Sequence, residues 1–123
     1  MAEIEVEFVT VERRFWSGSA SMVVAKTTEG EVGIQAGHEP LLGELDEGGT
    51  VTVYTDEGKK VAAVQGGFLS VTAKKVSILG ESAVWADDID RSEAERALSE
   101  AGDDAAAAAA ARGRLRAVEK AGA

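Results

Sequence analysis

Few side chains in this 123-residue sequence could carry out covalent chemistry. There is one histidine, His38, and no cysteine, so a cysteine nucleophile and a thiolate metal site are both excluded. No Asp, Glu and His residues cluster with metal-ligand spacing, and no serine lies in a nucleophile-elbow pattern. Phosphate-binding glycine motifs are also missing from the sequence. We therefore expect no catalytic residue, no metal site and no independent enzyme.

Charge and hydropathy narrow the classes of partner. The formal net charge of −9 gives a surface that repels phosphate backbones and anionic lipid, so we expect no nucleic-acid binding. No run of about 18 apolar residues exists, which predicts no direct insertion into a membrane. The start, M-A-E-I-E-V-E, is unlike a signal peptide and favours the cytoplasm. The simplest interpretation of the negative charge is that it keeps the protein soluble. The alternative is that the acidic surface attracts a basic surface of a partner.

The stretch most typical of a docking site covers residues 30–42, G-E-V-G-I-Q-A-G-H-E-P-L-L. It contains the only proline and the only histidine, and its glycines, among them Gly30 and Gly33, suit positive φ or close backbone approach. We expect a shaped surface loop that no periodic element explains, with Leu42 returning to the core. Loops held firmly on a rigid scaffold often carry binding sites.

Two side chains of this stretch could take part in such binding. His38 could be a catalytic base or a pH switch, but a lone loop histidine more often has a structural or interface role, which we favour. Glu31 stands between two glycines and is expected to be exposed. It is either a solvated carboxylate or a contact to a partner, and Glu29 could extend the same acidic rim.

The elements that must position this stretch are short strands. Residues 3–11 alternate between apolar and acidic side chains, which predicts a half-buried strand. A second strand is expected over 19–28, with Met22 and Val24 pointing inward. Further strands are expected at 50–55, 59–65, 68–72, 75–79 and 82–86, with a break at 66–67. Roughly eight to ten strands favour a sandwich or flattened barrel of two antiparallel sheets.

The character of the sequence changes after residue 86. Asp90 with Glu93 three residues later is typical of a helix N-terminus, and Gly102 of a helix end. A second helix opens with seven alanines and is expected to span about fifteen residues. Apolar stripes on both helices are thin, so we predict a helical hairpin that is mobile or whose position depends on partners. The predicted division is a β-sandwich domain over 1–86 and a helical hairpin over 87–123.

Three motifs, which also follow one another along the chain as in the family, resemble those of the epsilon subunits of rotary F-type ATP synthases. The first is the 30–42 stretch, in which Ala36 stands where the family usually has proline. The second, Gly66-Gly67-Phe68-Leu69-Ser70-Val71, is followed by Val76-Ser77-Ile78-Leu79 and Glu81-Ser82-Ala83. The third is the early turn Phe15-Trp16-Ser17-Gly18. The resemblance implies a ten-stranded antiparallel β-sandwich followed by a C-terminal two-helix antiparallel hairpin.

The resemblance also implies a function. Such a chain would be a non-catalytic rotor subunit of the central stalk, couple proton flow to ATP synthesis, and inhibit ATP hydrolysis through its helices. Its partners would be the gamma subunit, the proteolipid ring and, through the helices, the catalytic alpha/beta head. Its place would be the cytoplasmic face of the cell membrane. The residues implied at the ring and gamma contact are Glu31, His38, Gly30, Gly33 and Glu29.

Two further sets of residues follow from the resemblance. Some bacterial members bind ATP through an I-D-x-x-R-A motif; Asp90 and Ala94 fit it, but Glu93 replaces the arginine and would repel phosphate. Arg91 or Arg96 would have to substitute, so ATP as a regulatory ligand stays an alternative and no other cofactor is expected.

The only basic cluster is Arg112, Arg114 and Arg116. These residues either complement a helix C-terminus or bind an acidic rim of the catalytic head. Two other functions are kept open: an ATP-sensing domain and an unrelated β-sandwich binding module.

Overall fold

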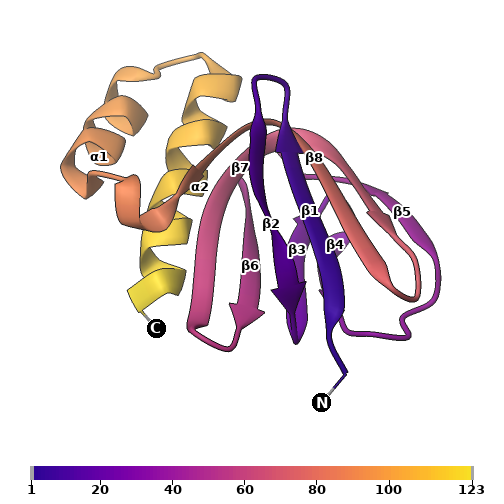
Figure 1. The fold of residues 1–123 in the computed structure, drawn as a ribbon. Coiled ribbons are helices and arrows are strands. Elements are labelled where there is room, and N and C mark those ends of the chain that lie inside the picture. Colours follow the sequence, from indigo (N-terminus) through magenta and orange to yellow (C-terminus); the bar gives the residue numbers. More distant parts are fainter. Residues whose placement is uncertain (1, 123) are drawn as a thin grey trace.

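The computed structural model describes residues 2–122 and consists of a β-sandwich with two helices on one side (Figure 1). The strands are β1 (Ile4–Thr10), β2 (Arg14–Ala20), β3 (Met22–Thr27), β4 (Gly30–Ile34), β5 (Leu41–Glu44), β6 (Gly49–Thr55), β7 (Gly58–Val71) and β8 (Lys75–Trp85). A 3-10 turn, η1 (Ala86–Asp88), leads into α1 (Arg91–Glu100) and α2 (Ala105–Gly122). The expected sandwich followed by a helical hairpin is therefore present.

All eight strands belong to one hydrogen-bonded sheet that folds over on itself. The strand order is β2-β1-β8-β7-β6-β3-β4, and β5 also pairs with β7. The first half of β7 pairs with β6 and its second half with β5, so β7 and its neighbour β8 run through both layers of the sandwich. We call the layer containing β1, β2 and β5 the first layer, and the layer containing β3, β4 and β6 the second layer.

The prediction of ten strands is wrong because two long strands replace four expected short ones. Gly66 and Gly67 have φ of 65° and 112° and bend β7 without ending it. A Cβ added to Gly67 would lie 1.9 Å from the carbonyl oxygen of Leu79, so the close approach requires glycine. Before the bend Ala62 and Val64 face the core, and after it Leu69 and Val71 do, while pairing with β8 keeps its register.

The expectation of purely antiparallel sheets is also wrong, because β1 and β8 pair in parallel. Glu5 lies opposite Lys75 and Thr10 opposite Gly80. Parallel strands need a long connection between them, and here the connection is the whole remainder of the sandwich. The first and last strands of the sandwich thereby hold each other in place.

The core lies between the two layers and is built by alternating side chains. Ile4, Val6 and Phe8 of β1 are buried, as their alternation with glutamates predicts. In β3 the inward residues are Val23 and Ala25, while Met22 and Val24 are half-buried. The prediction that Met22 and Val24 point inward is therefore wrong by one residue, because the apolar run M-V-V-A contains no polar residue to indicate its outward face.

The helices pack on the outer face of the second layer, with α2 against β7 and α1 outside α2 (Figure 1). The side chain of Asp90 accepts a hydrogen bond from the backbone N–H of Glu93 at 3.2 Å, and Gly102 takes φ of 55° after α1. These local signals are confirmed. The second helix has 18 residues rather than about fifteen, because helical geometry continues through Gly122.

Candidate docking surfaces

Most of the 30–42 stretch is not a loop, as the sequence analysis expected, but a strand and its flanks. Residues 30–34 form β4, which pairs with β3, and only the segment between β4 and β5 is irregular. Gly30 has φ of 126° at the β3–β4 turn, where glycine is favoured. Gly33 has no positive φ, and a Cβ there would meet only the sulfur of Met22 at 4.0 Å. Glycine is thus not required at position 33.

His38 lies half-buried in the short loop after β4. The loop is fixed by a hydrogen bond of 2.8 Å from the N–H of Gly37 to the carbonyl of Ala73, and by one from the N–H of His38 to Gln35. The Nδ1 atom of His38 lies 2.6 Å from the carbonyl oxygen of Glu39. The histidine therefore makes local backbone contacts that hold the loop in shape.

Glu31 and Glu29 are exposed at the end of the β3–β4 hairpin. Thr27 shapes the turn: its hydroxyl donates to the carbonyl of Gly30 at 2.7 Å and accepts from the N–H of Glu29 at 3.2 Å. The carboxylate of Glu31 forms an ion pair of 2.6 Å with the ammonium of Lys120 near the end of α2. Sequence reasoning missed Lys120, because nothing local relates two residues that are 89 positions apart.

An apolar surface on the first layer was also missed. Its exposed large side chains are Val11 and Leu42, each 78% exposed, Phe68 at 54% and Leu79 at 50%. Phe68 and Leu79 lie directly opposite each other in the β7–β8 ladder, and both line one groove with Val11. We call these four residues the apolar stripe. Leu42 had been expected in the core, but β5 directs Leu41 inward and Leu42 outward.

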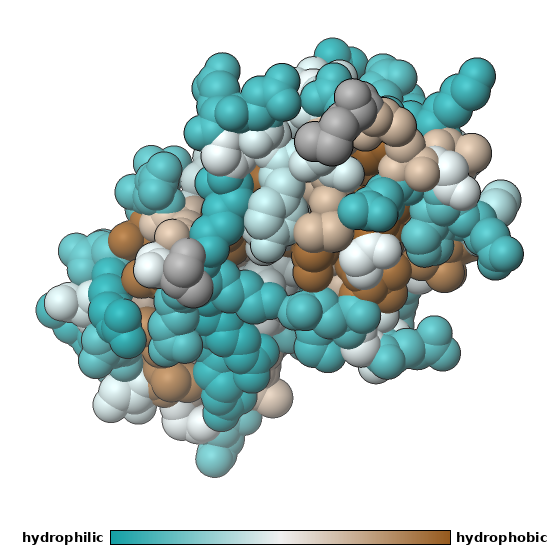
Figure 2. Space-filling model, turned by 90° about the horizontal axis from the view of Figure 1, so that it is seen from below, coloured by the Kyte–Doolittle hydropathy of each residue, from teal (hydrophilic) through white to brown (hydrophobic). Residues whose placement is uncertain are grey.

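Hydrophilic side chains dominate another side of the molecule. Seen from below, much of the surface is hydrophilic, and hydrophobic side chains form separate patches between polar ones (Figure 2).

Among residues 2–122 no group of three side chains is arranged to hold a metal ion. In the same described range, no helix has both the length and the apolar character needed to cross a bilayer.

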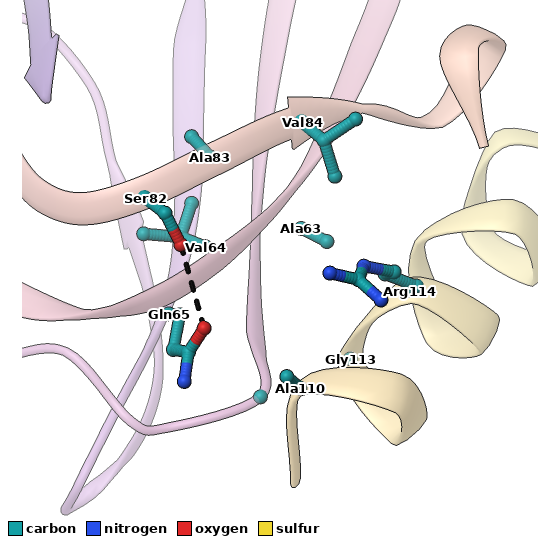
Figure 3. Close-up of a pocket in the computed structure, with 10 residues that line it drawn as sticks. Ala63, Val64, Gln65, Ser82, Ala83, Val84, Ala110, Gly113 and Arg114 are labelled. Atoms are coloured by element: carbon teal, nitrogen blue, oxygen red, sulfur yellow. Dashed lines mark hydrogen bonds between the residues drawn. The ribbon is translucent and has the colours of Figure 1, made fainter. Parts of the chain in front are cut away.

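A small pocket lies between α2 and the β7–β8 ladder (Figure 3). It is lined by Gly48, residues 63–65, residues 82–84, Ala110, Gly113 and Arg114. The hydroxyl of Ser82 donates to Gln65 Oε1 at 3.4 Å across one side, and the Arg114 guanidinium extends toward the strands. Its volume of about 120 Å³ is well below the roughly 300–1,000 Å³ of small-molecule sites.

The three residues considered for nucleotide binding do not line this pocket. Asp90 caps α1, and Arg91 forms ion pairs with Glu95 at 3.5 Å and Glu119 at 3.7 Å. Arg96 is an exposed residue of the same helix. Arg91 therefore joins the two helices, which gives it a structural use that the sequence analysis did not consider.

The arginines of α2 do not form a single patch. Arg112 and Arg116 are four residues apart and share one face, whereas Arg114 lies on another face of the helix. Arg116 donates to the carbonyl of Gly48 at 3.2 Å, and Arg114 lines the pocket. All three are exposed, so they remain accessible on different sides of the helix.

A contact between two glycines sets the distance between α2 and the sandwich. A Cβ on Gly113 would lie 2.7 Å from the Cα of Gly48, and one on Gly48 would lie 2.1 Å from the carbonyl oxygen of Ala109. One helical turn further on, Ala117 is fully buried against Val61 and Ala63 of β7. Small residues thus allow close contact but bury little apolar area.

The chain is similar in sequence to a known protein family. The family profile of the ATP synthase delta/epsilon chain β-sandwich domain matches residues 3–86. The chain is 62% identical over 122 residues to the ATP synthase epsilon chain of Rhodococcus opacus, covering 98% of this chain and all of the relative. It is 51% identical to that of Corynebacterium diphtheriae, covering 98% and 97%.

Solved structures are similar over the whole chain. A chain in a cryo-EM structure of the Euglena gracilis mitochondrial ATP synthase, comprising OSCP, F1 and the c-ring, matches with a TM-score of 0.78 and 25% identity. That match covers 100% of this chain and 83% of the other. A chain of the Tetrahymena thermophila central stalk and c-ring, at 23% identity and a TM-score of 0.58, supports the fold alone.

Proposed function

Because this chain belongs to the ATP synthase epsilon chain family, we propose that its sandwich holds the rotor contacts while its helices regulate ATP hydrolysis. The chain is a non-catalytic subunit of the central stalk of a rotary ATP synthase. In this proposal it couples proton flow to ATP synthesis at the cytoplasmic face of the cell membrane. We place the boundary between the two parts after residue 86, one residue past the end of β8 and within η1.

The apolar stripe is the observation that carries the proposal. Four large apolar side chains lie exposed on one layer, three of them around one groove, and an exposed apolar patch usually marks an interface with a protein. We assign it to the neighbouring gamma subunit of the stalk. The helix α2 packs on β7 and β6 of the opposite layer, so the gamma subunit and the helices do not compete for one surface.

The turn that carries Glu31 and Glu29 is proposed to face the proteolipid ring, while the loop of His38 follows the opposite end of β4 and is proposed only as part of the wider ring and gamma contact. Glu31 projects from the β3–β4 hairpin and its side chain is 51% exposed, so a basic ring loop could reach it. Gly30 and Gly33 keep this hairpin free of bulk. A Cβ at Gly33 would meet only the sulfur of Met22, at 4.0 Å, so we expect this position to accept alanine.

Two charge variants separate the ring contact from the ion pair within the chain. Glu31→Lys breaks the pair with Lys120, whereas Glu31→Lys combined with Lys120→Glu restores it with reversed polarity. If Glu31 contacts the ring, both variants should lower the protons pumped per ATP hydrolysed by the assembled synthase. Normal pumping by the double variant would contradict the ring contact.

The regulatory part of the proposal is tested with a synthase core depleted of this subunit. ATP hydrolysis is titrated with the full chain and with a truncation after Asp88, whose folding is first checked by circular dichroism. We expect both to bind and only the full chain to slow hydrolysis. Binding by both without inhibition would leave a coupling subunit with no brake, and inhibition by the truncated chain would move the brake into the sandwich.

A further inference from the structure

We infer that the Glu31 carboxylate has two alternative partners. It holds the end of α2 through its ion pair with Lys120, and it must leave Lys120 when a cationic group of a partner binds it. The inference rests on the proposed function for its second half, in which the partner is the ring. Its first half concerns the isolated chain alone. A ring contact at Glu31 would thereby loosen the helix that regulates hydrolysis.

The contacts of α2 with the sandwich show where Lys120 acts. Gly113 touches Gly48, Arg116 donates to the Gly48 carbonyl at 3.2 Å, and Ala117 is buried against β7. Lys120 is the next contact along the helix, and among the contacts described here it is the one that reaches the β3–β4 hairpin. It therefore fastens the end of α2 to a different part of the sandwich from the other contacts.

The surrounding packing makes this ion pair matter. Three of the four buried residues in the cluster under α2 are alanines, which bury little apolar area; the fourth is Val61, and Val84 and Ile89 pack partly buried against them. The helix begins with a run of seven alanines, which fold easily but hold the sandwich weakly. Where the apolar contribution is small, a single close ion pair is a larger fraction of the docking free energy.

The pair can also be displaced, because both groups are accessible. The side chain of Lys120 is 37% exposed and that of Glu31 is 51% exposed. An exposed ion pair contributes little and is screened by salt, so an added cation at Glu31 can compete with Lys120. A deeply buried pair would resist such exchange, and this position is suited to reversible docking.

The absence of cysteine from the sequence allows a direct test in the full-length isolated chain. Ala117→Cys places one thiol at the fully buried contact with β7, and its rate of alkylation reports how often α2 leaves the sandwich. In this background we compare Glu31→Gln, Lys120→Gln and the exchange Glu31→Lys with Lys120→Glu. Glu29→Gln is the matched control, since Glu29 is an exposed carboxylate on the same turn.

Both single variants should raise the alkylation rate about 1.5- to 5-fold at low salt, the range expected for an exposed pair. The exchanged pair and Glu29→Gln should leave the rate unchanged, and 1 M salt should remove the differences. An acetylated tetralysine amide should raise the rate in the chain with Glu31 and have a smaller effect with Glu31→Gln. Equal rates in all variants at low salt would overturn the inference.

Alkylation of the isolated chain and proton pumping by the assembled synthase distinguish a failure of this inference from a failure of the proposed function. If alkylation responds as expected but the exchanged pair pumps protons normally in the assembled synthase, Glu31 fastens α2 without contacting the ring. If pumping falls and alkylation does not change, the ring contact stands and Lys120 does not hold the helix. A rise in alkylation with Glu29→Gln as large as with Glu31→Gln would show a general charge effect and would also overturn the inference.

Discussion

The contact between Gly48 and Gly113 shows how two missing side chains fix the position of a whole helix. Neither position leaves room for a Cβ, so α2 approaches the turn before β6 with its backbone. The sequence indicated nothing of this contact, because Gly113 stands inside a helical pattern where glycine is normally unfavourable. Its cost to the helix is offset by the close packing that it permits.

We therefore expect Gly113→Ala to loosen the docking of α2 although it favours the helix itself. Overpacking costs about 1–3 kcal/mol, against a gain in helix propensity of at most about 1 kcal/mol. Tryptic cleavage after Arg116 should become faster than in the unsubstituted chain. Gly122→Ala is the matched control, because a Cβ there meets nothing within 4 Å. Equal protection of both variants would show that the Gly48 turn yields readily.

At the scale of elements, the helix ends could be predicted from local sequence, whereas the length of β7 could not. Asp90 and Gly102 act on their nearest neighbours, and both were predicted correctly. Gly66 and Gly67 carry an equally clear local signal for a break, but pairing with β8 continues on both sides of them. Strand length is decided here by a partner distant in sequence, which local reasoning does not include.

The same limitation explains the errors around residues 30–42. The glycines and proline indicated a loop, yet β3 and β4 pair from Val23 opposite Ile34 to Thr27 opposite Gly30. The ion pair of Glu31 with Lys120 depends on the packing of α2, which no local pattern reveals. The exposure of Glu31, by contrast, was predicted from its place between Gly30 and Gly33 and is confirmed.

We predict opposite effects on the free energy of unfolding for alanine at Gly67, which lies in the bend of β7, and at Gly33, which has open surroundings. Gly67→Ala should lower the free energy of unfolding by about 3 kcal/mol or more, because it combines unfavourable φ with a clash against the β8 backbone. Gly33→Ala should cause no loss, or a gain of up to about 1 kcal/mol. Urea unfolding followed by tryptophan fluorescence measures both. A large loss at Gly33 would restore the interpretation that residue 33 needs glycine.

At the scale of the whole molecule, the apolar stripe and the helices occupy the outer faces of different layers. Phe68 lies on the second half of β7, and Val61 and Ala63, which receive α2, lie on the first half. One continuous strand therefore connects the proposed gamma contact with the platform for the helices. If both proposals hold, we expect the sandwich to stay bound to the stalk when the helices change position.

Phe68→Ser should weaken binding to a gamma-containing stalk complex while leaving the fold intact. Phe68 is 54% exposed, so its loss costs the sandwich little, whereas a buried interface anchor is typically worth about 2 kcal/mol or more, or roughly 30-fold in Kd. Phe68→Leu keeps apolar area and should bind nearly normally. Titration calorimetry against the complex measures both, and unchanged binding of the serine variant would exclude the stripe as the gamma contact.

The parallel pairing of β1 with β8 has a consequence for how the chain leaves the ribosome. The first strand is synthesised early, but its partner at residues 75–80 follows only after most of the sandwich has been translated. At typical rates of about 5–20 residues per second, β1 waits roughly 3–13 seconds with one edge unpaired. Its alternating glutamates keep the nascent segment charged during this interval. Charged side chains on an unpaired strand disfavour pairing with other chains, so we expect the acidic face of β1 to limit aggregation of the nascent chain.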